Sequence, residues 1–101
     1  MDPERLSDIQ IADVVISTAG RDQGELFYVI GTDPVYLMLA NGKDRTLDKP
    51  KRKKRKHIQK VLRSETRVAA KLMAGDKVLN SELRRDLAYI AREMQANNLG
   101  G

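Results

Sequence analysis

The chain has 101 residues, which is enough for one hydrophobic core, and it carries 19 Lys and Arg against 14 Asp and Glu. It contains no cysteine and one histidine, which excludes a disulfide framework, a cysteine nucleophile and a metal site built from several Cys or His side chains. The first residues lack the pattern of a signal peptide, and the longest apolar run, residues 35–40, is too short to span a membrane. We therefore expect a soluble cytoplasmic protein with no membrane association.

The first half of the chain predicts short strands. Before them, residues 2–6 favour either one helical turn or a frayed end. Three segments are rich in β-branched and aromatic residues, as strands are: residues 13–17, 25–30 and 35–39.

The connections between these strands carry turn signals. Gly20 and Gly24 predict a tight loop between the first two strands, because glycine readily adopts a positive φ. Asn41 and Gly42 predict a type I′ hairpin turn, and a short fourth strand over residues 43–47 is expected to follow it.

A strongly basic segment comes next. Residues 43–63 hold 11 Lys and Arg and 2 Asp, whereas the other 80 residues hold 8 basic and 12 acidic side chains. Pro50 disfavours a helix at the start of the densest run, and mutual repulsion of the cations predicts an extended chain there. Residues 57–62 regain an alternating pattern, which predicts a short fifth strand.

From Ser64 onward the apolar period changes from two to 3.6, which predicts two helices. Ser64 is the expected N-cap of the first helix and Gly75 its stop. Asn80 or Ser81 is the expected cap of the second helix, which is predicted to end at residues 97–101. Its apolar stripe consists of Leu83, Leu87, Ile90, Ala91 and Met94.

These elements predict a mainly β protein. Four to five strands this short hide their edges best in a small, strongly curved barrel, which we place in residues 1–63. Residues 64–101 are expected to form a helical extension that packs on or beside the barrel, the apolar stripe of the second helix facing inward.

The basic segment is the main candidate for function. Nucleic acid presents closely spaced phosphates, and cationic side chains release the condensed counterions when they bind. Arg can contact a phosphate through two hydrogen bonds, and Lys acts as a mobile point charge. The alternatives are a solvated linker and a nuclear-localisation signal. The predicted contacts are Lys43, Arg45, Lys49, Lys51, Arg52, Lys53, Lys54, Arg55, Lys56, His57 and Lys60.

Two further features are candidate binding elements, and catalytic motifs are absent. The loop between Gly20 and Gly24, with Arg21, either approaches a phosphate or serves only the turn geometry. Phe27 and Tyr28 are neighbours in a predicted strand and point to opposite faces, which favours core packing over base stacking. No catalytic motif or metal signature is found, so we predict no enzyme activity, no metal and no cofactor.

Part of the chain resembles a known family. The stretch DVVISTAGRDQG at residues 13–24 resembles a KOW motif, the strand–loop–strand unit of several ribosomal proteins and transcription elongation factors. The continuation FYVI, followed by VYLMLANGKDRTLDKPKRKKRKHIQ, is similar to the KOW-domain family related to the archaeal and eukaryotic large-subunit ribosomal protein of the fourteen-e type. The resemblance spans residues 9–62 and extends loosely to the helices.

The resemblance implies an SH3-like barrel that binds structured RNA, typically ribosomal RNA. It implies that the loop formed by Gly20, Arg21, Asp22 and Gly24 faces RNA or shapes the turn. It also places Lys43 and Arg45, which follow the Asn-Gly turn, and the basic stretch of residues 51–57 among the family's basic positions.

The chain departs from the family pattern at three places. Ala12 stands where a glycine often opens the motif strand. Thr18 and Gln23 stand where basic residues are common, which lowers the positive charge of the loop.

The sequence therefore predicts a non-enzymatic RNA-binding protein, ribosomal-protein-like or ribosome-associated, that recognises the shape of RNA rather than its base sequence. One alternative is a protein-interaction module, in which the basic segment binds an acidic protein and the face from Leu83 to Met94 docks a partner. The other alternative is a transcription-associated KOW factor that contacts DNA or the transcription machinery.

Overall fold

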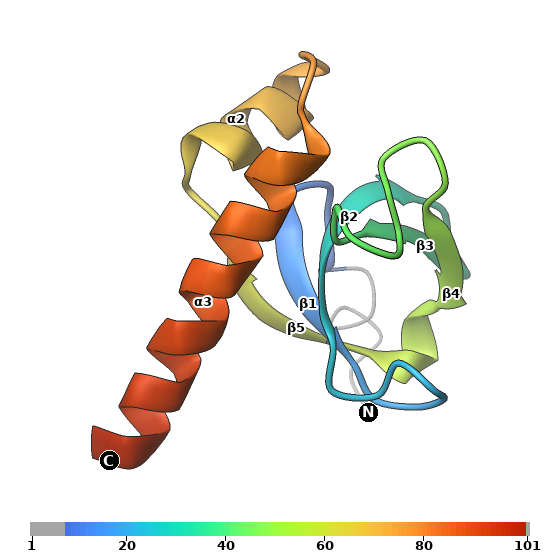
Figure 1. Ribbon diagram of the computed structural model, residues 1–101. Coiled ribbons are helices and arrows are strands. Elements are labelled where there is room, and N and C mark those ends of the chain that lie inside the picture. Colours follow the sequence, from blue (N-terminus) through green and yellow to red (C-terminus); the bar gives the residue numbers. More distant parts are fainter. Residues whose placement is uncertain (1–7, 101) are drawn as a thin grey trace.

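The computed structural model describes residues 8–100, with side chains described to Ala96, so the predicted turn at residues 2–6 lies outside the described part. It shows a five-stranded antiparallel sheet followed by two helices (Figure 1). The strands are β1 (Asp13–Ser17), β2 (Leu26–Thr32), β3 (Tyr36–Ala40), β4 (Lys51–Lys54) and β5 (Ile58–Arg63). One turn of 3-10 helix, η1 (Arg55–His57), joins β4 to β5, and the helices are α2 (Arg67–Ala74) and α3 (Asn80–Gly100).

The sheet is strongly curved. Its strand order is β4-β3-β2-β1-β5, so β4 and β5 form opposite edges although η1 alone connects them. In a flat sheet these edges would lie about 19 Å apart, because neighbouring strands are spaced by about 4.8 Å. One 3-10 turn advances the chain by only about 6 Å, so the sheet must bend until its edges approach each other at η1. No ladder joins β4 to β5 in residues 8–100, and the sheet is not closed.

Strand alternation builds an apolar cluster on each face of the sheet. The concave face encloses an interior cluster: Ile9, Val15, Phe27, Val29, Leu37, Leu39 and Ile58. The other face forms an outer cluster with the helices: Ala12, Val14, Tyr28, Ala40, Val68, Ala69, Leu83, Leu87 and Ile90. Phe27 and Tyr28 thus point to opposite faces, as the sequence predicts, and both are buried.

The helices cover one half of the outer face. Figure 1 shows α3 crossing the sheet obliquely and extending past it, with α2 packed near its first turns. Leu83, Leu87 and Ile90 of α3 are buried against the sheet and Met94 is half-buried, which confirms the inward packing of the stripe at these four positions, whereas Ala91 is exposed. Within the described residues, no helix is long and apolar enough to cross a membrane.

The predicted hairpin at Asn41 and fourth strand over residues 43–47 are wrong. The chain forms an irregular loop there, and β4 arises from the lysine-rich run that follows. A type I′ turn needs a positive φ at both central residues, but only Gly42 has one, at 77°. The Asn41 side chain shapes the turn instead, because its Oδ1 accepts hydrogen bonds from the amides of Lys43 at 2.9 Å and Arg45 at 3.0 Å.

The helix boundaries differ slightly from those predicted. Thr66, not Ser64, is the N-cap of α2, and its side chain accepts a hydrogen bond from the Ala69 amide. Gly75 ends α2 in the left-handed conformation, as expected. In α3, Asn80, one of the two predicted caps, is the first helical residue, and the helix ends at Gly100, within the predicted range of residues 97–101.

Candidate nucleic-acid interface

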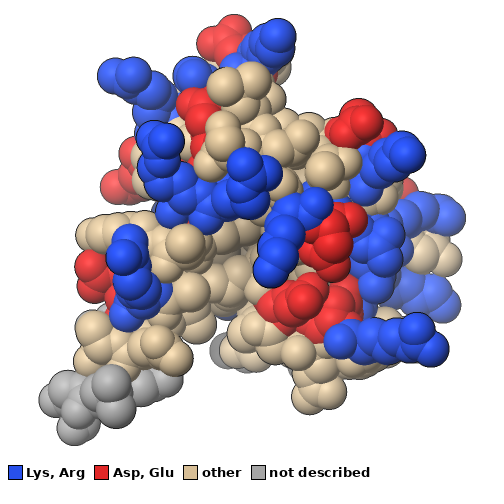
Figure 2. Space-filling model, viewed as in Figure 1, with Lys and Arg blue, Asp and Glu red and all other residues tan. Residues whose placement is uncertain are grey.

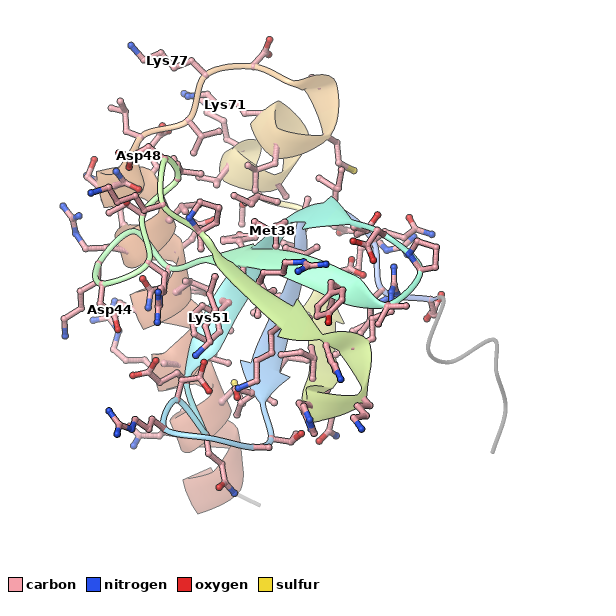
Figure 3. All side chains as sticks on the ribbon, turned by 90° about the vertical axis from the view of Figure 1, so that its right-hand side faces the viewer. Met38, Asp44, Asp48, Lys51, Lys71 and Lys77 are labelled. Atoms are coloured by element: carbon pink, nitrogen blue, oxygen red, sulfur yellow. The ribbon has the colours of Figure 1, made fainter. Side chains whose placement is uncertain are left out.

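The alternation of β4 divides the basic run into two sets. The register pairs Lys53 with Leu37, which belongs to the interior cluster, so Lys53 and Lys51 lie on the concave side of the strand. Arg52 and Lys54 project from the opposite side and are exposed. Figure 3 views the molecule from the side on which β3 and β4 lie, and it shows Met38 on β3 and Lys51 at the start of β4.

Lys53 is buried and fully engaged inside the protein. Its side chain is 9 % exposed, and its ammonium donates hydrogen bonds to Ser17 Oγ at 2.7 Å and to the Ala19 carbonyl at 2.6 Å. A third, very short contact joins it to the Asp22 carboxylate. We therefore no longer expect Lys53 to contact RNA, because binding a phosphate would require breaking these internal bonds.

Asp22 is the centre of this arrangement. Its Oδ1 accepts a hydrogen bond from Ser17 Oγ at 2.7 Å, and Lys51 Nζ lies 2.9 Å from its Oδ2. Burial on its own would raise the pKa of Asp22, but hydrogen bonds from Lys53, Lys51 and Ser17 outweigh burial and hold the pKa far below its usual range. The carboxylate is thus ionised at neutral pH and anchors β4.

The glycine loop, residues 18–24, is shaped by this anchor. Gly20 and Gly24 have φ values of 88° and 89°, so both adopt the left-handed conformation that the sequence predicts. A Cβ at Gly24 would meet no atom within 4 Å, so conformation and not space calls for glycine there. Arg21 is exposed on the same loop. The loop geometry is therefore explained without a ligand, and contact of the loop with RNA stays a prediction.

The outward set of cations lies on a surface that we call the β4–η1 face and define as Arg52, Lys54, Arg55 and Lys56. The guanidinium of Arg52 lies over the ring of Tyr36, 3.7 Å from its centroid. Lys54 and Lys56 are exposed, and Arg55 is half-buried.

Three of the predicted contacts lie on the loop before β4 and have carboxylates nearby. Lys43, Arg45 and Lys49 are exposed on the loop before β4, which also carries Asp44 and Asp48 (Figure 3). Hydrogen bonds from Asn41 to Asp44 and from Thr46 to Asp48 lower the pKa of each carboxyl group. Both carboxylates therefore stay charged and offset part of the positive charge of this loop.

Two more predicted contacts lie outside the β4–η1 face. Lys60 Nζ lies 3.3 Å from the buried Asp13 carboxylate and 3.4 Å from that of Asp8. His57 is half-buried, and its carbonyl accepts a hydrogen bond from the Thr18 amide at 2.9 Å. Lys60 thus has an internal charge partner, and His57 contributes to the fold through its backbone.

Cations outside residues 43–63 add to the surface charge, and sequence reasoning missed them. Figure 2 shows Lys and Arg side chains over the helices as well as on the β4 side, at the right of the view. Arg84 of α3 donates a hydrogen bond to the Gly42 carbonyl at 2.6 Å and so lies beside the loop before β4. The sequence pattern does not predict this contact, because the approach of Arg84 to the loop depends on how α3 packs.

A hollow of about 330 Å³ lies between β2 and α3, away from the β4–η1 face. Its lining is mostly apolar and includes Leu26, Leu87 and Ala91, with Lys43 and Arg84 also contributing. In the described residues, no group of three or more His, Cys, Asp or Glu side chains lies close enough to hold a metal ion. No protein-family model matches the chain, and no curated protein matches it significantly.

Proposed function

We propose that the protein is a non-enzymatic binder of structured RNA, ribosomal RNA above all, and that the β4–η1 face is its main phosphate contact. The observation that carries this proposal is the exposure of Arg52, Lys54 and Lys56 together on β4 and the η1 turn that follows it. Within residues 8–96, no ion pair joins any of these three side chains to a carboxylate, in contrast to Lys51, Lys53 and Lys60. Phosphate contacts of this kind position RNA without reading its bases.

We further propose that the curved sheet is an SH3-like barrel of the KOW type. The approach of the two edge strands at η1 supports a barrel-like shape. Ala12 supports the KOW comparison, because its φ of 77° is the conformation that a glycine adopts without strain, and glycine is common at that family position. This resemblance favours a ribosomal or ribosome-associated role in the cytoplasm.

The two lysines on the concave side of β4, Lys51 and Lys53, have a positioning role in this mechanism. The Asp22 carboxylate holds Lys51 and Lys53 on the concave side of β4. Because side chains alternate along a strand, this anchor fixes the outward direction of Arg52 and Lys54. The cations that meet RNA are thus preorganised, which lowers the entropic cost of binding.

The test is removal of charge from the β4–η1 face. We expect the triple variant of Arg52, Lys54 and Lys56 to Gln to weaken binding to structured RNA at low salt. The slope of log affinity against log salt should become shallower by about 2–3, since each phosphate contact contributes slightly less than one. Affinity is measured by fluorescence anisotropy over a salt series.

A matched control removes the same charge elsewhere. Lys77, Arg85 and Arg92 are exposed in the helical part of the chain, and their change to Gln should leave the slope almost unchanged. Equal losses in both triple variants would contradict a localised interface. Duplex DNA that competes as well as structured RNA would favour the transcription-associated alternative.

The protein-interaction alternative has less support, because the face from Leu83 to Met94 packs against the sheet. Pull-down with and without ribonuclease, together with co-sedimentation with ribosomal subunits, separates the two. Partners that survive ribonuclease would favour protein interaction.

A further inference from the structure

A small apolar hollow lies beside the cations of the β4–η1 face. It measures about 210 Å³ and is lined by Pro34, Val35, Lys54, Arg55 and Lys56. Its lining is mainly apolar although three of these residues carry positive charge. The Val35 side chain is 53 % exposed, so an apolar surface is open to solvent beside the β4–η1 face.

Hydrogen bonds of the Asp33 and Arg55 side chains and of the backbone fix the shape of the hollow. Asp33 Oδ1 accepts hydrogen bonds from the amides of Val35 at 2.8 Å and Tyr36 at 2.7 Å, which closes the turn before β3. The Arg55 amide donates to the Val35 carbonyl at 2.9 Å, and Arg55 Nε donates to the Asp33 carbonyl at 2.8 Å. These bonds join the β2–β3 turn to η1, so ligand binding needs little ordering of either segment.

Tyr36 and the Arg52 guanidinium stacked on it form a flat surface next to this hollow, and such a surface suits a planar ring. Lys54 lines the hollow and stands opposite Tyr36 in the β3–β4 ladder. Tyr36 carries the stacked guanidinium of Arg52. Planar guanidinium groups and aromatic rings are the groups on which unpaired bases stack.

We propose that this hollow seats an unpaired base of the bound RNA, with the flanking phosphates on Lys54 and Lys56. A nucleotide combines an apolar base face with an anionic phosphate, and the hollow offers an apolar floor with a cationic rim. A base inside a perfect duplex cannot present its face, because it is stacked on both sides. The inference rests on the proposed RNA binding and narrows the ligand class to RNA with bulged or single-stranded nucleotides.

The experiment compares two RNA hairpins that differ by one bulged nucleotide in the stem and whose strands are joined by a non-nucleotide linker, so that the perfect hairpin has no unpaired base. The wild-type protein should bind the bulged hairpin more tightly by about fivefold or more, which corresponds to the lower part of the range for base stacking. Val35→Ser should abolish this preference and leave the affinity for the perfect hairpin unchanged. Met73→Ser is the matched control, because Met73 is 63 % exposed on α2, away from the hollow.

A direct contact measurement accompanies the affinities. A 4-thiouridine at the bulge should crosslink to the peptide that contains Val35, as mapped by mass spectrometry. Equal affinity of the wild-type protein for both hairpins, or crosslinks confined to other segments, would overturn the inference and leave the proposed RNA binding intact. Failure to bind either hairpin at low salt would instead contradict the proposed function, and tighter binding of a poly-glutamate peptide would contradict both.

Discussion

At the scale of single residues, Asp22 decides what the basic run can do. It lies 31 positions before Lys53 in the chain, yet its carboxylate binds that ammonium and pairs with Lys51. Both Asp22 and Lys53 are buried. A buried ion pair of this kind adds little net stability compared with apolar residues, but loss of one partner leaves an uncompensated charge.

We therefore expect Asp22→Asn to destabilise the fold by about 3–5 kcal/mol at pH 7. The pKa of Asp22 is lower in the folded than in the unfolded protein, so its contribution is present above about pH 4 and is lost as the pH falls below that value. The difference in the free energy of unfolding between wild type and Asp22→Asn should therefore become smaller as the pH falls. Urea unfolding at several pH values between 7 and 3 measures it.

Asp48→Asn provides the control for this prediction. Asp48 is exposed on the loop before β4, so its replacement should change the free energy of unfolding by less than about 0.5 kcal/mol. If Asp22→Asn behaved like Asp48→Asn, the anchoring role of Asp22 would be wrong.

At the scale of elements, a buried polar network joins the sheet to both helices. The Tyr28 hydroxyl of β2 lies 2.8 Å from Ser64 Oγ and donates a hydrogen bond to Asp86 Oδ2 of α3 at 2.7 Å. Thr66, the N-cap of α2, also donates to Asp86 Oδ2, at 2.6 Å. Burial and the neighbouring Asp86 carboxylate raise the pKa of Tyr28, so the phenol stays protonated and able to donate.

Tyr28→Phe removes this donor and leaves the packing of the ring in place. We expect a loss of about 1–3 kcal/mol, because the Asp86 carboxylate loses a donor and the Ser64 hydroxyl loses the oxygen to which it donates. Hydrogen exchange should become faster in α3 than in the sheet, since the network is the polar link between them. Chemical denaturation and hydrogen-exchange mass spectrometry measure the two effects.

Tyr89→Phe is the matched control, because Tyr89 lies on α3 and is 56 % exposed. It should unfold at nearly the wild-type denaturant concentration. An equally small effect of Tyr28→Phe would mean that apolar packing alone couples α3 to the sheet.

At the scale of the whole molecule, the sheet and the helices share one cluster. Val14, Tyr28 and Ala40 of the sheet are buried against Val68 of α2 and Leu83 of α3. Removal of the helices would expose this apolar surface to water. The expected boundary near residue 63 therefore separates two kinds of secondary structure that complete one core.

We predict that a fragment of residues 1–63 does not form a stable monomer. The exposed outer cluster should lead to unfolding or self-association, whereas the full chain should remain monomeric at the same concentration. Size-exclusion chromatography and thermal unfolding followed by circular dichroism test this. A monomeric fragment that unfolds cooperatively would show that the strands form an independent domain.

Local pattern was sufficient for most of the secondary structure. The apolar periods predicted β1, β2, β3, β5 and both helices, because each pattern reflects which face of the element is buried. The positive φ of Gly75 and the opposite directions of Phe27 and Tyr28 also follow from residue type and strand geometry alone.

Two local errors have a tertiary cause. The run Lys51–Lys54 has no apolar alternation, so its sequence pattern does not predict a strand. It becomes a strand because it pairs with β3. Gly42 lies against α3, where an added Cβ would be 2.2 Å from the Asn80 carbonyl oxygen. This packing and the Asn41 side chain, rather than the Asn-Gly preference, shape the turn.

The sequence by itself determined where the cations are concentrated and which segments form the layers of the fold. Only the tertiary structure decided which cations are exposed to a ligand. Lys53 is buried in an ion pair with Asp22, whereas Arg52 and Lys54 are exposed. Composition sums charges along the chain, but the field of an ammonium group depends on the carboxylate that folding brings to it from a distant segment.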